Sequence, residues 1–153
     1  MDEATTPEPT PTGREALTGL HPVLVEHFLR PKNIGEIEDA DGVGSAGDPS
    51  CGDHVRYWIK VVDNRISDIR FKCLGCPAAI ACASVVGELA LGKGLDEACE
   101  MTDEMISEIL GGLPAHKMHC SNMAADALYD AVMDYVVNWI DRFKSTGQPP
   151  EAP

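Results

Sequence analysis

Two segments of the chain, 55–61 and 69–73, alternate between apolar and polar side chains. Successive side chains of a β-strand point to opposite faces of a sheet, so this period of two predicts strands with one buried face. Asp63 and Asn64 lie between the two segments and are typical of a tight turn. We therefore expect an antiparallel hairpin. The segment 42–47, which lies in a stretch rich in Gly and Asp, is consistent with a short edge strand.

Two helices are indicated on either side of this hairpin. Residues 22–29 predict a short amphipathic helix, because Pro22 suits a first helical position and Pro31 prevents continuation. The run of small and apolar residues from 78 to 91 predicts a buried helix that ends at Gly92. Close packing through small side chains is expected for this second helix.

The remaining third of the chain predicts further helices. Short ones are expected at 95–101 and 103–110, the second capped by Thr102. A long final helix is expected from about 121 to 143, with an apolar stripe made of Leu128, Val132, Tyr135, Val136, Trp139 and Phe143. The fold class is therefore α+β, with a small antiparallel sheet of about three strands packed against helices.

The two ends of the chain differ from the middle in composition. Residues 1–19 combine Thr, Pro and acidic side chains and contain too little apolar surface to fold, so we expect a disordered arm. Residues 145–153 have the same character and should form a disordered tail. The 153-residue chain thus holds one folded domain, at 20–144, in which the function must lie.

Charge and targeting signals narrow the class of partner. The net charge is −13 with only 12 basic residues, which argues against binding to nucleic acid or to an anionic membrane surface. The N-terminus has no signal-peptide pattern, and no apolar run reaches the roughly 20 residues that a membrane span needs. We expect a cytoplasmic protein, where six cysteines serve as ligands, catalysts or small buried side chains and not as disulfides.

Three short motifs supply candidate metal ligands: Cys51 with Asp53, then Cys76, then His119 with Cys120. Thiolates suit zinc, iron and iron-sulfur clusters, and a carboxylate and an imidazole beside them make a mixed, exchangeable ligand set. Cys76 also precedes the expected helix at 78–91, whose N-terminus favours the thiolate form. Sequence spacing alone does not establish that the three motifs meet.

Four segments in order along the chain carry a resemblance to a known family. They are 31–35 (Pro-Lys-Asn-Ile-Gly), 51–53 (Cys-Gly-Asp), 71–81 (Phe-Lys-Cys-Leu-Gly-Cys-Pro-Ala-Ala-Ile-Ala) and 117–121 (Lys-Met-His-Cys-Ser). In order and approximate spacing they resemble the IscU/NifU-type iron-sulfur cluster assembly scaffolds. The resemblance implies a scaffold, not an enzyme, on which a cluster is built and from which it passes to apo-proteins.

The resemblance also implies roles for the candidate residues. Cys51, Cys76 and Cys120 match the three cysteines that hold the nascent cluster, Asp53 matches the acidic residue linked to cluster lability, and His119 matches an alternative ligand. Cys120 is the expected acceptor of sulfur as a persulfide. The expected cofactors are iron and a 2Fe-2S cluster, with 4Fe-4S as an alternative cluster and zinc as an alternative occupant.

Partners follow from the same resemblance: a cysteine desulfurase, apo recipients of the cluster, a frataxin-like protein and a ferredoxin. Whether two protomers form a homodimer stays open. Residues 113–117 read Leu-Pro-Ala-His-Lys, where some members carry Leu-Pro-Pro-Val-Lys for a specialised heat-shock chaperone. Use of that chaperone is therefore also open.

Three other functions compete with the scaffold. A zinc-dependent sulfur acceptor for a desulfurase would use the same ligands, but its relatives usually carry an insertion before the last cysteine and lack the preceding His. A thiol hydrolase is disfavoured because His119 and Cys120, as neighbours, are expected to point apart. A purely structural zinc site is disfavoured because such sites are mostly closed sets of Cys and His ligands, and Asp53 does not belong to such a set. Cys73 and Cys82 are expected to be small buried side chains, and Cys99 to be either structural or merely tolerated.

Overall fold

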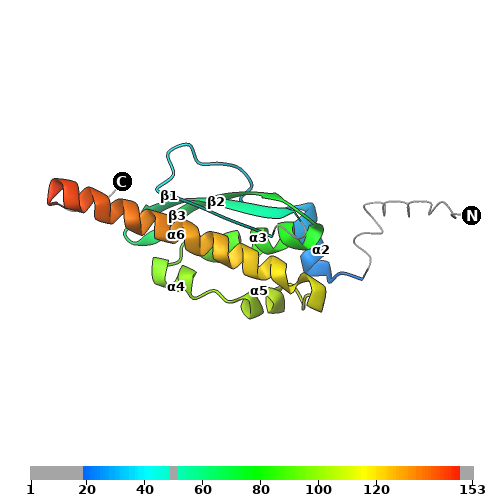
Figure 1. The fold of residues 1–153 in the computed structure, drawn as a ribbon. Coiled ribbons are helices and arrows are strands. Elements are labelled where there is room, and N and C mark those ends of the chain that lie inside the picture. The colour runs from blue at the N-terminus through cyan, green and yellow to red at the C-terminus, as the bar shows by residue number, and fades with distance from the viewer. Residues whose placement is uncertain (1–18, 49–51, 149–153) are drawn as a thin grey trace, which may run out of the picture.

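The computed structural model describes residues 19–48 and 52–148, which form a three-stranded antiparallel sheet with helices packed against it (Figure 1). The sheet order is β1-β2-β3, with strands Gly42–Asp48, Asp53–Val62 and Arg65–Leu74. This confirms the predicted α+β class and the three expected strands. Most of the arm and tail expected at the chain ends lies outside the described residues.

The hairpin of β2 and β3 follows directly from the sequence pattern. Asp63 and Asn64 connect the strands with φ angles of 51° and 62°. Positive φ at both central positions is the geometry of a two-residue type I′ turn, whose twist matches that of the strands. The apolar positions of β2 then point to one side, and their side chains are buried: Val55, Tyr57, Ile59 and Val61.

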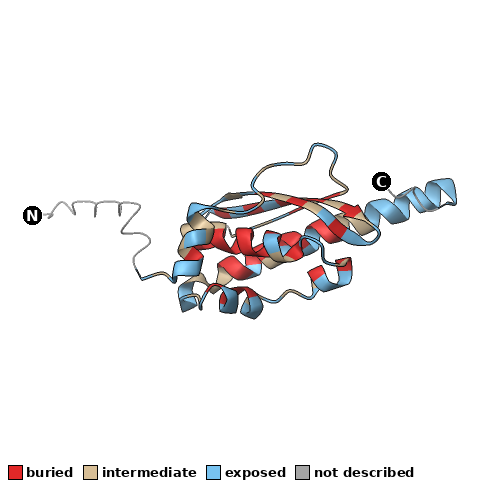
Figure 2. Cartoon of the chain, turned by 180° about the vertical axis from the view of Figure 1, so that it is seen from behind, coloured by how far each residue is buried: buried red, intermediate tan, exposed pale blue. Residues whose placement is uncertain are grey.

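The core lies between this face of the sheet and the helices (Figure 2). Helix α3, Pro77–Ala90, contributes the largest share of small side chains, and ten of its residues are buried. Tyr57 of β2 is fully buried, and its hydroxyl donates a hydrogen bond of 2.6 Å to the carbonyl of Ala83. A buried hydroxyl without a partner would be costly, so this bond fixes how α3 lies on the sheet.

The long helix α6, Met118–Thr146, crosses the sheet over β1 (Figure 1). The helix approaches the strand so closely that a Cβ atom at Gly44 would overlap the backbone of Ala131. Only a strand with glycines at these positions can accept a helix at this distance. The glycine content of segment 42–47, seen in the sequence as a turn signal, therefore serves helix packing.

Helix α6 also covers the backbone of the edge strand. The amide of Val43 donates to Asp134 Oδ2 at 2.9 Å, and the amide of Ser45 donates to Asp130 Oδ2 at 3.1 Å. Unpaired amides on an edge strand invite pairing with another chain. The two aspartates occupy the hydrogen-bonding positions that a fourth strand would otherwise take.

The shorter helices match their predicted positions closely. Helix α2 is Pro22–Leu29, and the ring of His21 accepts a hydrogen bond from the Val23 amide at its start. Helices α4 and α5 are Leu95–Cys99 and Asp103–Ile109. Thr102 caps α5 as expected, since its hydroxyl accepts from the amide of Met105 at 3.2 Å.

Helix α6 differs from its predicted bounds at both ends. It begins at Met118, directly after the 3₁₀ turn Ala115–Lys117, and continues to Thr146. Ser121 resembles a cap in the sequence, but its hydroxyl donates to the carbonyl of Met118 at 2.7 Å inside the first turn. No helix of the described chain is long and apolar enough to cross a membrane.

The predicted apolar stripe of α6 is only partly buried. Leu128 and Val132 are in the core, and Tyr135 and Val136 are half-buried. The last two members of the stripe, Trp139 and Phe143, are 36% and 42% exposed. The helix extends beyond the sheet, so its C-terminal turns have nothing from the described chain to pack against (Figure 2).

Candidate metal centre

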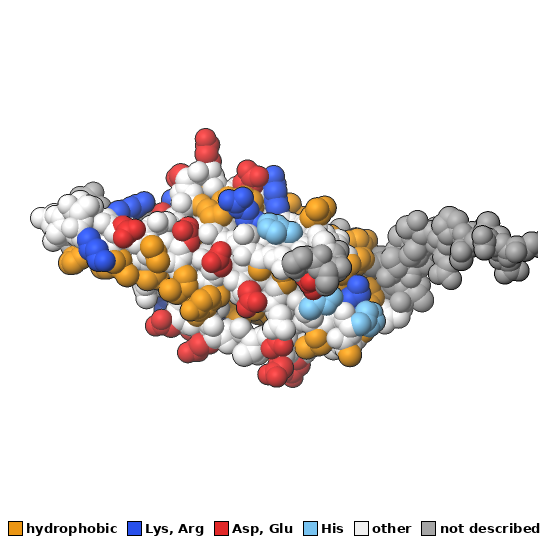
Figure 3. Space-filling model, viewed as in Figure 1, with side chains coloured by type: hydrophobic (Ala, Val, Ile, Leu, Met, Phe, Trp, Pro, Cys, Tyr) orange, Lys and Arg blue, Asp and Glu red, His pale blue; other side chains and the backbone are white. Residues whose placement is uncertain are grey.

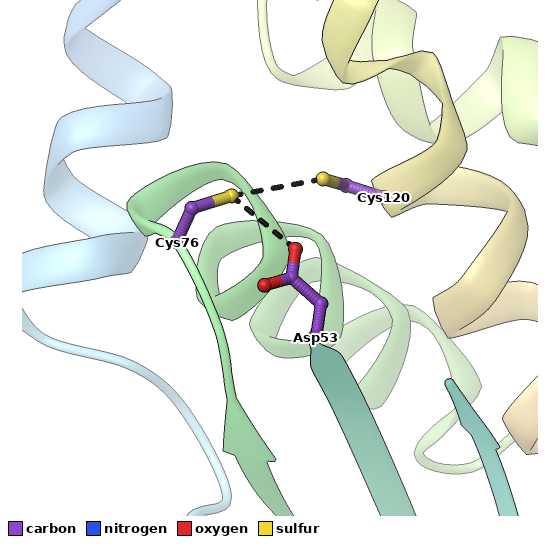
Figure 4. Close-up of side chains that lie close together, drawn as sticks. All are labelled: Asp53, Cys76 and Cys120. Atoms are coloured by element: carbon purple, nitrogen blue, oxygen red, sulfur yellow. Dashed lines mark hydrogen bonds between the residues drawn. The ribbon is translucent and has the colours of Figure 1, made fainter. Parts of the chain in front are cut away.

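Three of the predicted ligands, Asp53, Cys76 and Cys120, converge at one end of the sheet (Figure 4). Asp53 is the first residue of β2, Cys76 directly precedes α3, and Cys120 lies in the first turn of α6. One ligand atom from each residue lies within 4.8 Å of the others. The fold therefore brings together the three motifs, which their spacing in the sequence could not establish.

The three side chains already contact one another. Cys76 Sγ lies 3.6 Å from Asp53 Oδ2 and 3.8 Å from Cys120 Sγ. Cys76 is half-buried, whereas Asp53 is 8% exposed and Cys120 is fully buried. The thiol of Cys76 is thus the most accessible of the three groups.

Electrostatics separate the two thiols. The hydrogen bond from Cys120 is the main reason that the pKa of Cys76 falls to about 5, with further lowering from the Ala79 amide and the charge of Lys117. The pKa of Cys120 rises strongly, first because its proton bonds to Cys76 and then because it is buried. The pair therefore holds one proton near neutral pH, as a Cys76 thiolate and a Cys120 thiol.

His119 belongs to the same cluster. Its Nε2 atom lies 3.6 Å from Cys120 Sγ and 3.9 Å from Asp53 Oδ2. The expectation that the neighbouring side chains of His119 and Cys120 point apart is wrong. The two residues are neighbours in the first turn of α6, and the imidazole reaches the thiol of Cys120. Its contact with Asp53 makes it an available fourth ligand.

Cys51, the remaining predicted ligand, lies outside the described residues. The chain resumes at Gly52, which has a φ of +74° and whose amide donates to the Asp48 carbonyl at 2.8 Å. Asp48 and Asp53 are opposite one another at the end of the β1–β2 pair. The connection that carries Cys51 therefore starts and ends beside the three converged ligands.

Gly75 shapes the site in a way that the sequence did not indicate. A Cβ atom there would lie 3.0 Å from Asp53 Cγ, 3.0 Å from Asp53 Oδ1 and 3.0 Å from the Ala79 side chain. The missing side chain makes room for the carboxylate beside Cys76. In the sequence, the position of Gly75 directly before a candidate ligand was the only possible indication of this role. The same position is equally typical of an ordinary turn residue.

The cysteines excluded from the site lie elsewhere or are protonated. Cys82 is fully buried in α3, and burial raises its pKa to about 12. Burial likewise raises the pKa of the half-buried Cys73 to about 12. Cys99 is half-buried on α4, where burial raises its pKa. The exclusion of these three thiols is consistent with their positions and ionisation.

The described cluster offers two sulfurs, one carboxylate and one imidazole. Two thiolates suit iron and zinc alike, while an oxygen ligand on a thiophilic metal is more readily exchanged. The ligands lie where three separate elements begin: Asp53 and Cys76 come at the start of β2 and just before α3, whereas Cys120 is buried in the first turn of α6. Such a site can take up a thiophilic metal and release it again.

Comparison with known proteins identifies the family. The profile described as "NifU-like N terminal domain" matches residues 20–140, nearly all of the described chain. This protein belongs to the NifU-like N-terminal domain family. The family assignment agrees with the resemblance seen in the four sequence motifs.

Individual relatives in the NifU-like family are closely similar. "Iron-sulfur cluster assembly scaffold protein IscU 1" of Archaeoglobus fulgidus is 52% identical over 126 residues, which are 81% of this chain and 82% of the relative. The IscU scaffold protein of Aquifex aeolicus is 44% identical over 116 residues, 74% of each chain.

A solved structure shares the fold of this NifU-like domain. It is the putative SUF-system scaffold of Fervidobacterium islandicum, which superposes with a TM-score of 0.63 at 22% identity and covers 72% of this chain and 94% of that one. This likeness shows that the two chains share a fold.

Proposed function

We propose that this protein is a scaffold for iron-sulfur cluster assembly: it binds iron, accepts sulfur and passes the finished cluster to apo-proteins. The convergence of Asp53, Cys76 and Cys120 within 4.8 Å carries the proposal, because it presents two cysteine sulfurs and an exchangeable oxygen at one point. The names of the Archaeoglobus and Aquifex relatives support it. The cluster is cargo in this role, so the protein acts without catalytic turnover of its own.

In this proposal Cys51, Cys76 and Cys120 hold the cluster, and Asp53 and His119 compete for the remaining position. Because five candidate ligands compete for at most four positions, one ligand can replace another at a low free-energy cost. The carboxylate of Asp53 is the weakest ligand for a soft metal. It therefore provides the position from which the cluster is most easily lost.

We propose Cys120 as the acceptor of sulfur from a cysteine desulfurase. Its thiolate would attack the outer sulfur of the desulfurase persulfide; a new S–S bond forms on Cys120, and the desulfurase cysteine leaves as a thiolate. Cys120 is buried and protonated in the metal-free site. Iron, which requires its thiol ligands to be deprotonated, should therefore bind before sulfur arrives.

The reductant that converts the bound sulfur to sulfide would be a ferredoxin, and a frataxin-like protein is a further partner in the proposal. We expect a 2Fe-2S cluster, with 4Fe-4S as the alternative product. A reducing cytoplasm suits the protein, since five described cysteines are free thiols.

The zinc-dependent sulfur acceptor is the weaker proposal. His119 is present and contacts the site, and residues 113–120 show no obvious insertion of the kind found in the zinc-type relatives. The thiol hydrolase loses its original counter-argument, because His119 does reach Cys120. It is disfavoured on other grounds: Cys120 is fully buried, and its raised pKa keeps it a thiol, which is a poor nucleophile.

Anaerobic reconstitution tests the scaffold function. Metal-free protein is supplied with ferrous iron, cysteine and a desulfurase, and then with an apo-ferredoxin. Visible absorption from thiolate-to-iron charge transfer should appear and then pass to the acceptor. Cys120→Ser should abolish stable cluster, while Cys99→Ser, a control at a thiol outside the site, should not. If no cluster forms, but the protein binds zinc and the desulfurase turns over faster, the protein would instead be a zinc-dependent sulfur acceptor.

A further inference from the structure

The outer face of α6 carries an apolar stripe that the metal centre does not use. The stripe consists of the exposed Tyr129, Met133, Ile140 and Phe143 together with Val136, which is half-buried at its inner edge, and it continues sideways onto the exposed Val137 and Trp139. Tyr129 and Val137 are 52% and 50% exposed. In the space-filling view, hydrophobic side chains gather over the C-terminal half of this helix (Figure 3).

The spacing of the stripe is that of a coiled coil. From Tyr129 to Phe143 the steps along the chain are four, three, four and three residues. A repeat of alternating three and four residues keeps one side of a helix facing a partner helix. The ring of Trp139 stacks on the ring of Phe143 with 5.6 Å between their centroids, which widens this end of the stripe with a second aromatic side chain.

Charges beside the stripe indicate how a second helix would lie. Asp126 and Lys144 are both exposed and are eighteen residues apart, about five helical turns, so they flank the same side of the stripe. A parallel copy related by a two-fold axis would place its Asp126 and Lys144 on the opposite flank of the interface, where neither meets a residue of opposite charge from this pair. An antiparallel copy would place Asp126 against Lys144 of the second copy, and Lys144 against Asp126 of the second copy.

The apolar residues of the stripe also fit the two-fold symmetry of an antiparallel pair. The two-fold axis that pairs Asp126 with Lys144 passes near residue 135. It also brings Tyr129 opposite Ile140 of the second copy and Met133 opposite Val137 of the second copy. Two independent features, charge and apolar spacing, therefore select one arrangement.

We propose that this face of α6 is an interface between two copies of this chain, packed with their α6 helices antiparallel. From the exposed fractions, the stripe offers on the order of 500 Å² of apolar surface per chain, near the lower limit for a specific dimer. The dimer is therefore weak, with a dissociation constant in the micromolar range. Residues 1–18 and 149–153 contain Leu17 and Met1 as their only large apolar side chains, so the chain's own ends are poor occupants.

The arrangement keeps the two metal centres apart. Cys120 lies fifteen residues before the two-fold axis, about 22 Å along the helix, and the second copy carries its site in the opposite direction. The two sites are then about 45 Å apart along the helices. The dimer cannot share one cluster, and both sites stay open to partners.

Sedimentation velocity of the metal-free protein, from about 2 to about 200 µM at about 0.15 M salt, tests the interface. A concentration-dependent dimer is expected. Val137→Asp should abolish it, with circular dichroism confirming an intact fold, because a carboxylate replaces an apolar contact. A protein that stays monomeric throughout, or a dimer that Val137→Asp leaves unchanged, would overturn the proposal.

A charge swap tests the antiparallel register. Asp126→Lys alone and Lys144→Asp alone should each raise the dissociation constant roughly 3- to 10-fold, because like charges then meet twice per dimer. The double variant should return the constant to within about 2-fold of wild type. Glu108→Lys, on the exposed surface of α5, is the control for the change in net charge. Failure of the double variant to restore dimerisation would rule out this register.

Discussion

The Sγ atoms of Cys76 and Cys120 lie 3.8 Å apart, and the single proton of this pair resides on Cys120. The asymmetry has a structural origin. Cys76 sits at the start of α3, where backbone amides favour negative charge, whereas Cys120 is fully buried in α6. One thiol is thus prepared as a ligand before any metal arrives.

The reactivity of Cys76 should reveal this ionisation. In metal-free protein its alkylation rate with iodoacetamide should stay nearly constant from about pH 8 to about pH 6 and fall only as the pH drops through about 5. Peptide mass spectrometry can follow the site. Cys120→Ala removes the hydrogen-bond donor and should move the midpoint upward. A wild-type midpoint near the ordinary thiol value of 9.0 would contradict the shared-proton arrangement.

Removal of the Asp53 carboxylate should slow the loss of a bound cluster. Asp53→Ala replaces the exchangeable oxygen ligand, so the cluster formed in reconstitution should persist several-fold longer in the presence of a chelator. The decay of the visible absorption measures this. Asp141→Ala, at an exposed position of α6, should leave the decay unchanged. A cluster lost faster in Asp53→Ala than in wild type would remove the lability role.

Gly75→Ala should disturb the site through sterics alone. The new methyl group would lie 3.0 Å from the Asp53 carboxyl carbon and displace the carboxylate. We expect a loss of about 1–3 kcal/mol in the free energy of unfolding and weaker binding of Co²⁺, used as a spectroscopic probe. Gly94→Ala is the matched control, since its nearest neighbours lie at 3.6 Å. Equal behaviour of the two variants would show that Gly75 is not sterically required.

The aspartates of α6 should matter for the edge strand. Asp134→Ala leaves the Val43 amide without its acceptor and should lower the free energy of unfolding by about 1–2 kcal/mol. Asp134→Asn keeps an acceptor oxygen and should lower it by less than about half of that. Urea unfolding under reducing conditions measures both. The hydrogen bond would be unimportant if the two variants were equally stable.

The sequence predicted the elements well where local chemistry decides the structure. The hairpin at Asp63 and Asn64 and the cap at Thr102 were both found, because turn and cap geometries depend on a few adjacent residues. The start of α6 was misplaced because Ser121 looks like a cap but bonds within the helix. No side chain caps the start of α6 at Lys117, so a search for a capping residue could not find where this helix begins.

The candidate site was predicted in composition but not in geometry. Residues 53, 76 and 120 lie far apart along the chain, and only the family resemblance joined them before the fold was known. The contact of His119 with Cys120 escaped prediction because side-chain reach, not backbone direction, decides it. His119 Nε2 also lies 3.9 Å from Asp53 Oδ2, and the charge of Lys117 lowers the pKa of Cys76.

The unequal ionisation of Cys76 and Cys120 also fixes a proton count for metal loading. Both sulfurs must be thiolates to bind a divalent ion, but Cys76 has already lost its proton near neutral pH. The pair therefore releases one proton on loading, where two ordinary thiols would release two. Through this pair, apparent metal affinity should change about tenfold per pH unit instead of about a hundredfold. Loading at this site is correspondingly less sensitive to acidification than at a site of two ordinary thiols.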